Sequence, residues 1–344
     1  MAVSDLTIAI GSYLEPAQVE RIAAAGPSVR VLYEPDLLPV PRYSSDHTGL
    51  RRDLTEAALG NWRALTARAD IFFDFDWLEP EAMTRHSPNL RWIQATSAGI
   101  GGFMQRTGLD GSGLTVTTAA GIHAVPLSEF AVTGALYFVK GIPQLRERQG
   151  ARHWERYATR QLAGLRALVV GLGGIGRATV ASFAGLGVEV WGLGRDHGSY
   201  QVAGLARLIT RSQLDAALAE IHILVLACPL TDDTEGMIGA AQIDLLRADA
   251  IVVNIARGPL IDQRALTEAL ADGRLGGACL DVFAVEPLPP DDPLWTLGNV
   301  LVSPHSASTV ATENAALVDL FLDNLGRFTA GVPLRNLYDP VRGY

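Results

Sequence analysis

The chain has 344 residues, 48% of them hydrophobic, and a formal net charge of −9. This length is enough for two domains, each with a core of its own. The acidic balance argues against binding to the phosphate backbone of nucleic acids, which needs a basic face. A small anionic substrate is not excluded, because one local arginine can bind a carboxylate against the overall field.

The two cysteines, Cys228 and Cys279, lie in apolar, strand-like runs. This is typical of core residues in a reducing compartment and not of a disulfide framework. The N-terminus lacks the basic region of a signal peptide, and no apolar run reaches the ~18 residues of a membrane helix. We therefore expect a cytoplasmic protein that neither enters a membrane nor binds nucleic acid.

The first third of the chain alternates short apolar strands with helical stretches, which predicts a parallel sheet with helices between its strands. The expected strands are residues 6–10, 29–33, 71–75, 90–95 and 114–117. Residues 34–60 are rich in proline and serine and predict an irregular loop with a short helix. Residues 126–139 form a long apolar helix, either an ordinary core helix or, as we expect, an inter-domain helix that also packs against a second subunit.

The second half contains six strands with clear ends, separated in most cases by helical patterns such as residues 178–186 and 264–270. These strands are expected at residues 168–170, 188–193, 223–227, 251–255, 278–282 and 300–303. Strands that alternate with helices in this way predict a doubly wound sheet.

The first of these six strands leads into GLGGIG, which fits the pattern G-x-G-x-x-G and opens a helical run. Gly171 permits a tight turn, Gly173 lets the backbone approach a pyrophosphate, and Gly176 lets the helix lie close to the strand. Together with Gly174 and Ile175, these glycines form the N-terminus of a helix, whose free N–H groups would face the phosphates. The alternative is an ordinary strand–helix turn.

The next strand ends at Gly194 and Arg195, where an NAD site would place an acidic residue to hold the ribose hydroxyls. A missing carboxylate removes repulsion toward a 2′-phosphate, and an adjacent guanidinium can bind it. We therefore expect a preference for NADP(H), with NAD(H) possible as well. The alternative is that Arg195 is a solvated loop residue.

Three polar residues follow strand ends in this half of the chain, which is where ligands bind in open α/β sheets. Arg257 suits the binding of a carboxylate and a carbonyl oxygen through its planar fork. His305 suits proton donation near neutral pH, and Glu286 beside it would keep it protonated. We expect these three residues to transfer a proton and orient a 2-keto or 2-hydroxy acid next to a nicotinamide.

Each of the three has a structural alternative. Arg257 could cap a helix or pair with Asp262, Glu286 could be a surface acid in a proline-rich loop, and His305 could be a satisfied structural histidine. The remaining histidines show no metal-ligand spacing, so we expect no metal site.

These residues lie in stretches that resemble the D-isomer-specific 2-hydroxyacid dehydrogenase family, which includes glyoxylate/hydroxypyruvate reductases and phosphoglycerate dehydrogenases. The stretches are NIARGPLID from Asn254, LDVFAVEPLP from Leu280 and SPHS from Ser303, with GIHAVPLSE from Gly121 and CPLTDDT from Cys228. The match covers roughly residues 90–310 in order. The resemblance implies Arg257 as substrate binder, His305 as acid/base and Glu286 as its partner.

The resemblance also implies an α/β fold with two doubly wound parallel-sheet domains. A Rossmann NAD(P)-binding domain (residues 119–306) would be inserted into a flavodoxin-like substrate-binding domain (residues 1–118 and 307–344). It further implies a homodimer built around the nucleotide-binding domains. Besides the glycine loop, Gly194 and Arg195, the cofactor contacts that we expect are Cys228, Pro229, Ala256 and Asp281.

In the family, a turn of the first domain holds the substrate carboxylate through backbone N–H groups, which form an anion-binding nest. The matching stretch begins at Thr96, and Ala98 and Gly99 are the candidates. The family often has Asp where this chain has Gly101, so the chain departs from the family pattern in this turn. Trp77 either lines the substrate pocket or is a packing residue.

Two other functions remain open at this stage. One is a nucleotide-sensing, corepressor-like binding protein of the same fold, although the chain has no long disordered arms for partners. The other is formate dehydrogenase, a relative with glutamine where this chain has Glu286. We expect a 2-keto acid reductase of the glyoxylate/hydroxypyruvate type, whose substrate side chain is not readable from the sequence.

Overall fold

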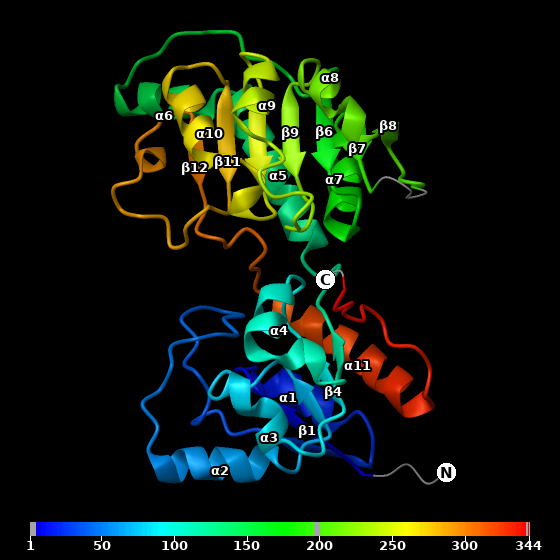
Figure 1. Cartoon of the computed structure of the whole chain (residues 1–344). Coiled ribbons are helices and arrows are strands. Elements are labelled where there is room, and N and C mark those ends of the chain that lie inside the picture. The colour runs from blue at the N-terminus through cyan, green and yellow to red at the C-terminus, as the bar shows by residue number, and fades with distance from the viewer. Residues whose placement is uncertain (1–4, 196–199, 342, 344) are drawn as a thin grey trace. The chain divides into compact units, whose positions relative to one another are not determined.

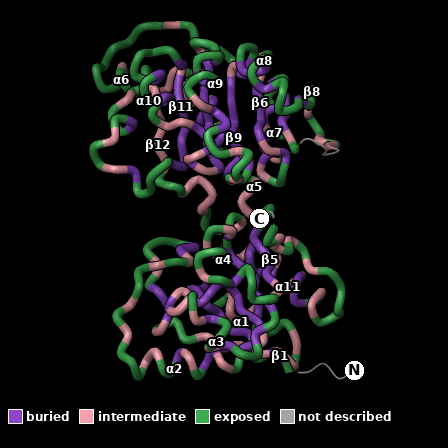
Figure 2. The backbone as a smooth tube through the Cα atoms, viewed as in Figure 1, coloured by how far each residue is buried: buried purple, intermediate pink, exposed green. Residues whose placement is uncertain are grey.

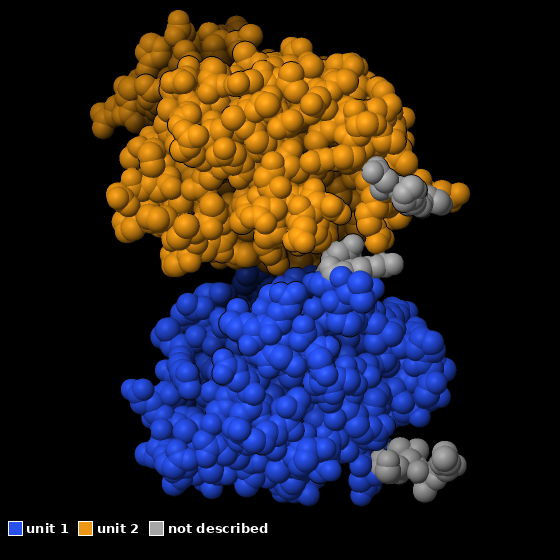
Figure 3. Space-filling model, in the orientation of Figure 1, with its two compact units in different colours: residues 1–122, 309–344 blue, residues 123–308 orange. Residues whose placement is uncertain are grey.

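The computed structural model describes residues 5–195, 200–341 and 343. The chain divides into two compact units, unit 1 with residues 1–122 and 309–344 and unit 2 with residues 123–308 (Figure 3). Each unit is built around one parallel sheet with helices on its faces (Figure 1).

Unit 1 contains a five-stranded sheet with the order β2-β1-β3-β4-β5, in which every pair is parallel. This is the flavodoxin-like order. Its elements are β1 (Leu6–Ile10), α1 (Pro16–Ala23), β2 (Val29–Leu32), α2 (Glu56–Thr66), β3 (Ile71–Phe73), α3 (Met83–His86), β4 (Trp92–Gln94), α4 (Gly101–Thr107), β5 (Thr115–Thr117) and α11 (Glu313–Ala330).

The strands of unit 1 are buried on both faces, so their side chains alternate between two apolar cores (Figure 2). Phe72 points into the core that includes residues of α2, α3 and α4. Phe73 points into the opposite core and packs edge-on against Phe321 of α11, with ring centroids 5.4 Å apart. The C-terminal segment thus returns to complete the sheet on which the chain began.

Unit 2 contains a seven-stranded parallel sheet with the order β12-β11-β10-β9-β6-β7-β8. Its elements are α5 (Ala124–Val139), α6 (Ile142–Gly150), β6 (Arg166–Val170), α7 (Gly174–Gly185), β7 (Glu189–Leu193), β8 (Leu205–Ile209), α8 (Leu214–Leu218), β9 (Ile223–Leu226), α9 (Ala240–Leu245), β10 (Ile251–Asn254), α10 (Gln263–Ala271), β11 (Gly277–Leu280) and β12 (Val300–Val302). The predicted fold class, two doubly wound parallel-sheet domains of which one is a Rossmann domain, is confirmed.

The sheet of unit 2 also separates two cores. Residues of α8, α9 and α10 cover one face, and residues of α5 and α7 cover the other. Along β6, Leu168 and Val170 face the first core, whereas Ala167 and Val169 face the second.

The strand order of unit 2 places β9 next to β6, on the side away from β7. The direction of the winding therefore reverses between β6 and β9, and such a switch point is where open α/β sheets bind ligands.

Two sequence expectations needed correction. The second half has seven strands where six were expected, because the edge strand β8 was missed. Three of its five residues are exposed, including Arg207, so it lacks the apolar run that marked the others. The short helix expected within residues 34–60 begins only at Glu56, as α2, and residues 34–55 are irregular.

The irregular segment 34–55 is held by one buried carboxylate. Asp46 accepts hydrogen bonds from the backbone N–H and the guanidinium of Arg42 and from the N–H of Gly49. Burial raises the pKa of Asp46, but these hydrogen bonds outweigh it, and the pKa lies well below its ordinary value. A pair of backbone hydrogen bonds between Val40 and Leu50 closes the same segment.

Among the residues that the structure describes, no helix is both long and apolar enough to cross a membrane.

Candidate active site

The glycine loop lies at the switch point between β6 and β9. Gly171 has φ +98°, and a Cβ there would lie 2.6 Å from the carbonyl oxygen of Ala227 and from the N–H of Cys228. A Cβ at Gly176 would collide with the backbone of Gly171, so α7 lies close to the strand. At Gly173, the N-cap of α7, nothing lies within 4 Å of the Cβ position. The loop therefore fits a pyrophosphate, with Gly171 and Gly176 required by packing and Gly173 facing open space.

Tyr200 explains why a glycine follows β7. A Cβ at Gly194 would lie 2.5 Å from Cζ of the Tyr200 ring, and the Tyr200 hydroxyl accepts a hydrogen bond of 2.8 Å from the backbone N–H of Arg195. The ring thus covers the position where an acidic side chain would begin. Arg195 itself is exposed at the carboxyl end of β7.

The turn that carries Arg257 is fixed by the buried side chain of Asn254. Its Oδ1 accepts from the N–H of Ala256 (3.1 Å), and its Nδ2 donates to the carbonyl oxygen of Arg257 (3.0 Å). The guanidinium of Arg257 donates to the carbonyl oxygen of Ala256. Burial lowers the pKa of Arg257, and the nearby negative charge of Glu286 opposes this shift. Asp262 instead accepts from the N–H of Ala265 and caps α10.

Glu286 and His305 form a direct hydrogen-bonded pair, with 2.8 Å between Oε2 of Glu286 and Nδ1 of His305. The other carboxylate oxygen of Glu286 accepts from the N–H of Phe283. Both side chains remain accessible, at 36% for Glu286 and 44% for His305. His305 has φ +54°, an uncommon backbone conformation outside glycine that often marks functional sites.

Gly258 brings the turn that carries Arg257 and the loop that carries Glu286 together. A Cβ at this position would overlap the carbonyl group of Phe283 and lie 2.5 Å from the N–H of Ala284. Only glycine therefore lets the turn after Arg257 pack against the start of the Glu286 loop. The sequence reading did not single out Gly258 or Asn254, although both stand in the motif that contains Arg257.

Asp281, expected to contact the cofactor, is 2% exposed and holds the His305 loop. Its Oδ1 accepts from the hydroxyl of Ser303 (2.6 Å) and from the N–H groups of Ser306 (2.9 Å) and Ala307 (3.0 Å). Burial raises the pKa of Asp281, and these hydrogen bonds offset part of that rise. Its contact with the cofactor stays a prediction.

The other expected cofactor residues lie at the same edge of the sheet. Cys228 is buried two residues after β9, and burial raises the pKa of its thiol to about 11, which is typical of a structural cysteine. Pro229 is exposed, and its carbonyl oxygen accepts from the hydroxyl of Thr234. Ala256 is buried between Asn254 and Arg257.

The expected substrate residues belong to unit 1. Ala98 and Gly99 lie in the turn between β4 and α4, Ala98 half-buried and Gly99 exposed. Trp77 donates a hydrogen bond from its indole N–H to Asp74 and packs against Phe103, with ring centroids 5.1 Å apart. These contacts favour the alternative of a packing tryptophan. A Cβ at Gly101 would collide with the backbone of Gly343, which gives a local reason for the glycine.

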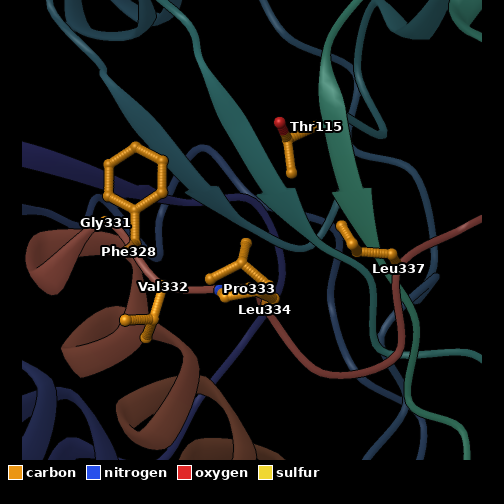
Figure 4. Close-up of a pocket in the computed structure, with 7 residues that line it drawn as sticks. All are labelled: Thr115, Phe328, Gly331, Val332, Pro333, Leu334 and Leu337. Atoms are coloured by element: carbon orange, nitrogen blue, oxygen red, sulfur yellow. The ribbon is translucent and has the colours of Figure 1, made fainter.

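A hollow of about 420 Å³ in unit 1 lies beside β5 and the C-terminal end of α11 (Figure 4). Its lining is mostly apolar and contains no titratable side chain, so it offers no catalytic group. Within residues 5–195, 200–341 and 343, no cluster of three or more His, Cys, Asp or Glu side chains is suited to a metal ion.

Comparison with known proteins identifies the family of this chain. Residues 132–307 match the model for the NAD-binding domain of the D-isomer-specific 2-hydroxyacid dehydrogenases, just over half of the chain. The chain belongs to this family. As a 2-hydroxyacid dehydrogenase, it is an NAD(P)-dependent oxidoreductase, and unit 2 contains its nucleotide-binding domain.

Three relatives illustrate the similarity. A glyoxylate/hydroxypyruvate reductase of Arabidopsis thaliana is 30% identical over 258 residues, which cover 74% of this chain and 78% of the relative. A D-isomer-specific 2-hydroxyacid dehydrogenase from Xanthobacter autotrophicus Py2, solved with NADPH and MES, has a TM-score of 0.78 at 29% identity, covering 99% of this chain and 100% of that one. A probable 2-hydroxyacid dehydrogenase from Rhizobium etli CFN 42, solved with NADP, HEPES and L(+)-tartaric acid, has a TM-score of 0.75 at 26% identity, with coverage of 99% and 100%.

Proposed function

We propose that this 2-hydroxyacid dehydrogenase reduces a small 2-keto acid of the glyoxylate or hydroxypyruvate type to the D-2-hydroxy acid. NADPH is the preferred reductant and NADH is accepted as well. The observation that carries the proposal is the 2.8 Å hydrogen bond between Glu286 and Nδ1 of His305, in the same unit as Arg257 and the glycine loop. The Arabidopsis relative, named a glyoxylate/hydroxypyruvate reductase, supports this substrate class.

The roles of the three side chains follow from their chemistry. When bound, the reduced nicotinamide supplies the hydride that adds to the carbonyl carbon. Arg257 binds the substrate carboxylate and polarises the carbonyl oxygen. Because Nδ1 of His305 is bonded to Glu286, Nε2 is the ring nitrogen that donates the proton to the carbonyl oxygen. Glu286 orients the imidazole and stabilises its charged form. The product is the hydroxy acid, and the imidazole of His305 is neutral once it has given up its proton.

The preference for NADPH rests on the two positions that follow β7, which are Gly194 and Arg195 and carry no carboxylate themselves. The ring of Tyr200 occupies the space where a side chain at position 194 would begin. An acidic residue at position 194, which would repel a 2′-phosphate, is therefore absent. The Xanthobacter and Rhizobium structures contain NADPH and NADP, respectively, which supports the same preference. Backbone N–H groups around Ala98 and Gly99 are the proposed partners of the substrate carboxylate in unit 1.

A spectrophotometric panel tests the proposal. Glyoxylate, hydroxypyruvate, pyruvate, phenylpyruvate and 2-ketoisocaproate are each reduced with NADPH and with NADH, and cofactor oxidation is followed. We expect the highest kcat/KM for glyoxylate or hydroxypyruvate with NADPH. No turnover with any of the five acids would reject the proposed activity, and a higher kcat/KM with NADH would reject the cofactor preference alone.

We also propose that the enzyme is a homodimer, joined through α6 and the segment 151–161. Helix α6 contains no buried residue, and of the eleven residues that follow it only Tyr157 is not exposed. A nine-residue helix is marginal in water without packing of one face. Trp154 is 96% exposed, although tryptophan normally buries most of its large apolar surface in a core or an interface.

Sedimentation velocity tests the dimer with Trp154→Ser. We expect the wild type to sediment as a dimer and the variant to dissociate. Trp295→Ser is the matched control, because Trp295 is also exposed, at 49%, but donates its indole N–H to Pro289 outside this segment. A monomeric wild type, or a Trp154→Ser variant as dimeric as the control, would contradict the proposed interface.

A further inference from the structure

Strand pairing in unit 2 aligns two arginines at the carboxyl edge of the sheet. Leu193 of β7 pairs with Ile209 of β8, and each is the last residue of its strand. Arg195 and Arg211 each follow two residues later, so they leave neighbouring parallel strands at the same level. Neighbouring strands lie ~4.8 Å apart, a separation that two guanidinium groups can bridge onto one phosphate.

The backbone at Arg211 is fixed by a local capping arrangement. The chain forms a 3₁₀ helix at Arg211–Gln213, capped by Thr210. The N–H of Thr210 donates to Oε1 of Gln213, and the N–H of Gln213 donates back to the carbonyl oxygen of Thr210. Both hydrogen bonds are 3.0 Å long. Leu214 then anchors the turn in the core. Arg211 is exposed on this ordered turn.

The charge of Arg211 also acts at the end of β9, at the carboxyl edge of the sheet. Cys228 follows β9 at the same level, because Val170 of β6 pairs with both Leu193 and Leu226. Burial raises the pKa of the Cys228 thiol, and the positive charge of Arg211 opposes this rise. The guanidinium of Arg211 therefore acts on the segment after β9, which the Gly171 turn also contacts.

We propose that Arg211 is a second residue that binds the 2′-phosphate of NADP(H), together with Arg195. The inference rests on the cofactor preference proposed above and adds a specificity-determining residue from a different strand. One guanidinium would neutralise only part of a phosphate monoester that carries a charge of about −1.5 to −2 at pH 7. Two guanidiniums from neighbouring strand ends neutralise it fully and can donate to different phosphate oxygens.

The ligands for the test are adenosine 2′,5′-bisphosphate and adenosine 5′-monophosphate, which differ only in the 2′-phosphate. Their affinities for the full-length protein are measured by titration calorimetry. The proteins are the wild type, Arg195→Ala, Arg211→Ala, the double variant and Arg211→Lys. The control is Arg247→Ala, which removes the same charge from the opposite edge of the sheet, where Arg247 pairs with Asp249 between α9 and β10.

We expect Arg211→Ala to weaken binding of the 2′,5′-bisphosphate ~10- to 100-fold, the range for a hydrogen bond between charged groups, and to weaken the 5′-monophosphate less than ~2-fold. Arg211→Lys should lose less, because it keeps a point charge without the planar fork. The double variant should deviate from the product of the two single effects, since both side chains bind one group.

The outcomes separate this inference from the proposals on which it rests. If Arg195→Ala loses selectivity for the 2′-phosphate while Arg211→Ala matches Arg247→Ala, the role of Arg211 is overturned and the NADPH preference stands. If the wild type binds the two ligands equally, both the preference and the role of Arg211 are overturned. Turnover of 2-keto acids is not needed for either result, so an inactive enzyme would reject only the proposed reaction.

Discussion

Gly258 offers a direct way to separate the turn that carries Arg257 from the loop that carries Glu286. In Gly258→Ala, the new Cβ would overlap the carbonyl group of Phe283 and lie 2.5 Å from the N–H of Ala284, whereas ordinary contacts begin at 3.4 Å. The two segments must therefore move apart by at least 0.9 Å, the difference between these two distances, and by more to clear the carbonyl group of Phe283. Because both sides of the contact are backbone, no side-chain rotation can absorb this movement.

The displacement acts on the geometry that the reaction needs. Arg257 precedes Gly258, and Glu286 is tied to Phe283 by a hydrogen bond of 2.9 Å. Moving Phe283 therefore moves Glu286, and with it the imidazole of His305, relative to Arg257. A misplacement of ~1 Å can cost ~100-fold in rate, so we expect kcat/KM to fall by about this factor. Overpacking of this kind should also lower the free energy of unfolding by ~1–3 kcal/mol.

Steady-state kinetics with NADPH and the best 2-keto acid measure the effect, and urea denaturation measures stability. NADPH affinity is recorded in parallel, because the glycine loop lies outside the displaced contact and should bind as in the wild type. Gly298→Ala is the control, since nothing lies within 4 Å of its Cβ position and its φ is not positive. If Gly258→Ala keeps kcat/KM within ~3-fold of the control, the packing of these two segments does not position the catalytic groups.

Three further predictions concern single side chains. His305→Ala should lower kcat by ~10²–10⁴-fold, the usual contribution of general acid catalysis, while the Kd for NADPH measured by fluorescence titration stays near the wild-type value. Weaker NADPH binding in proportion to the loss of kcat would contradict this role. Arg257→Ala should raise KM, because its contact with the substrate carboxylate exists in the ground state and the transition state alike, and should lower kcat, because its contact with the carbonyl oxygen strengthens as charge develops there, with kcat/KM at least ~100-fold down. A change in KM alone would limit Arg257 to substrate capture. Asp46→Asn should lower the free energy of unfolding at pH 7 by ~1–3 kcal/mol through loss of charge-assisted hydrogen bonds. Because hydrogen bonds from Arg42 and Gly49 hold the pKa of Asp46 below its ordinary value, this stabilisation is present above the unfolded pKa of ~4 and is lost as pH falls through the folded pKa. Urea denaturation at pH 7, 5 and 3 should therefore show the difference from wild type shrinking toward acid pH, and a constant difference would refute the assignment.

Local sequence patterns were sufficient wherever burial is continuous along an element. The strands β9, β10 and β11 are buried at every residue, so their apolar runs and their ends were readable. The glycine loop was readable for a related reason, because strand, turn and helix follow one another without interruption. Strand β8 was not readable, since an edge strand with exposed Arg207 and Leu208 resembles a loop.

Strand order and register carried the information that the sequence lacked. The sequence placed Arg195 near the cofactor because it follows the strand after the glycine loop. It did not single out Arg211, because no local sequence pattern shows that β8 pairs with β7 or that the two strands end side by side. Position 194 is a second example. The sequence shows that it is glycine and not an acidic residue, but only the folded chain shows that the ring of Tyr200 lies beside it.

Burial distinguishes the residues that act from those that hold them in place. A search for polar residues after strand ends finds Asn254, Asp281, Glu286 and His305 alike, because all follow or end strands of the same sheet. In the structure, Asn254 and Asp281 are 0% and 2% exposed and use their side chains on backbone groups of the neighbouring loops. The side chains of Glu286 and His305 are 36% and 44% exposed and hydrogen-bonded to each other.

This difference in burial has a physical reason. A buried polar group must satisfy its hydrogen bonds within the protein, and doing so makes the loop rigid. A histidine that donates a proton to a substrate has to keep one ring nitrogen accessible. Of these four residues, Asn254 and Asp281 are therefore inner supports, whereas Glu286 and His305 form the accessible pair that we propose takes part in the reaction.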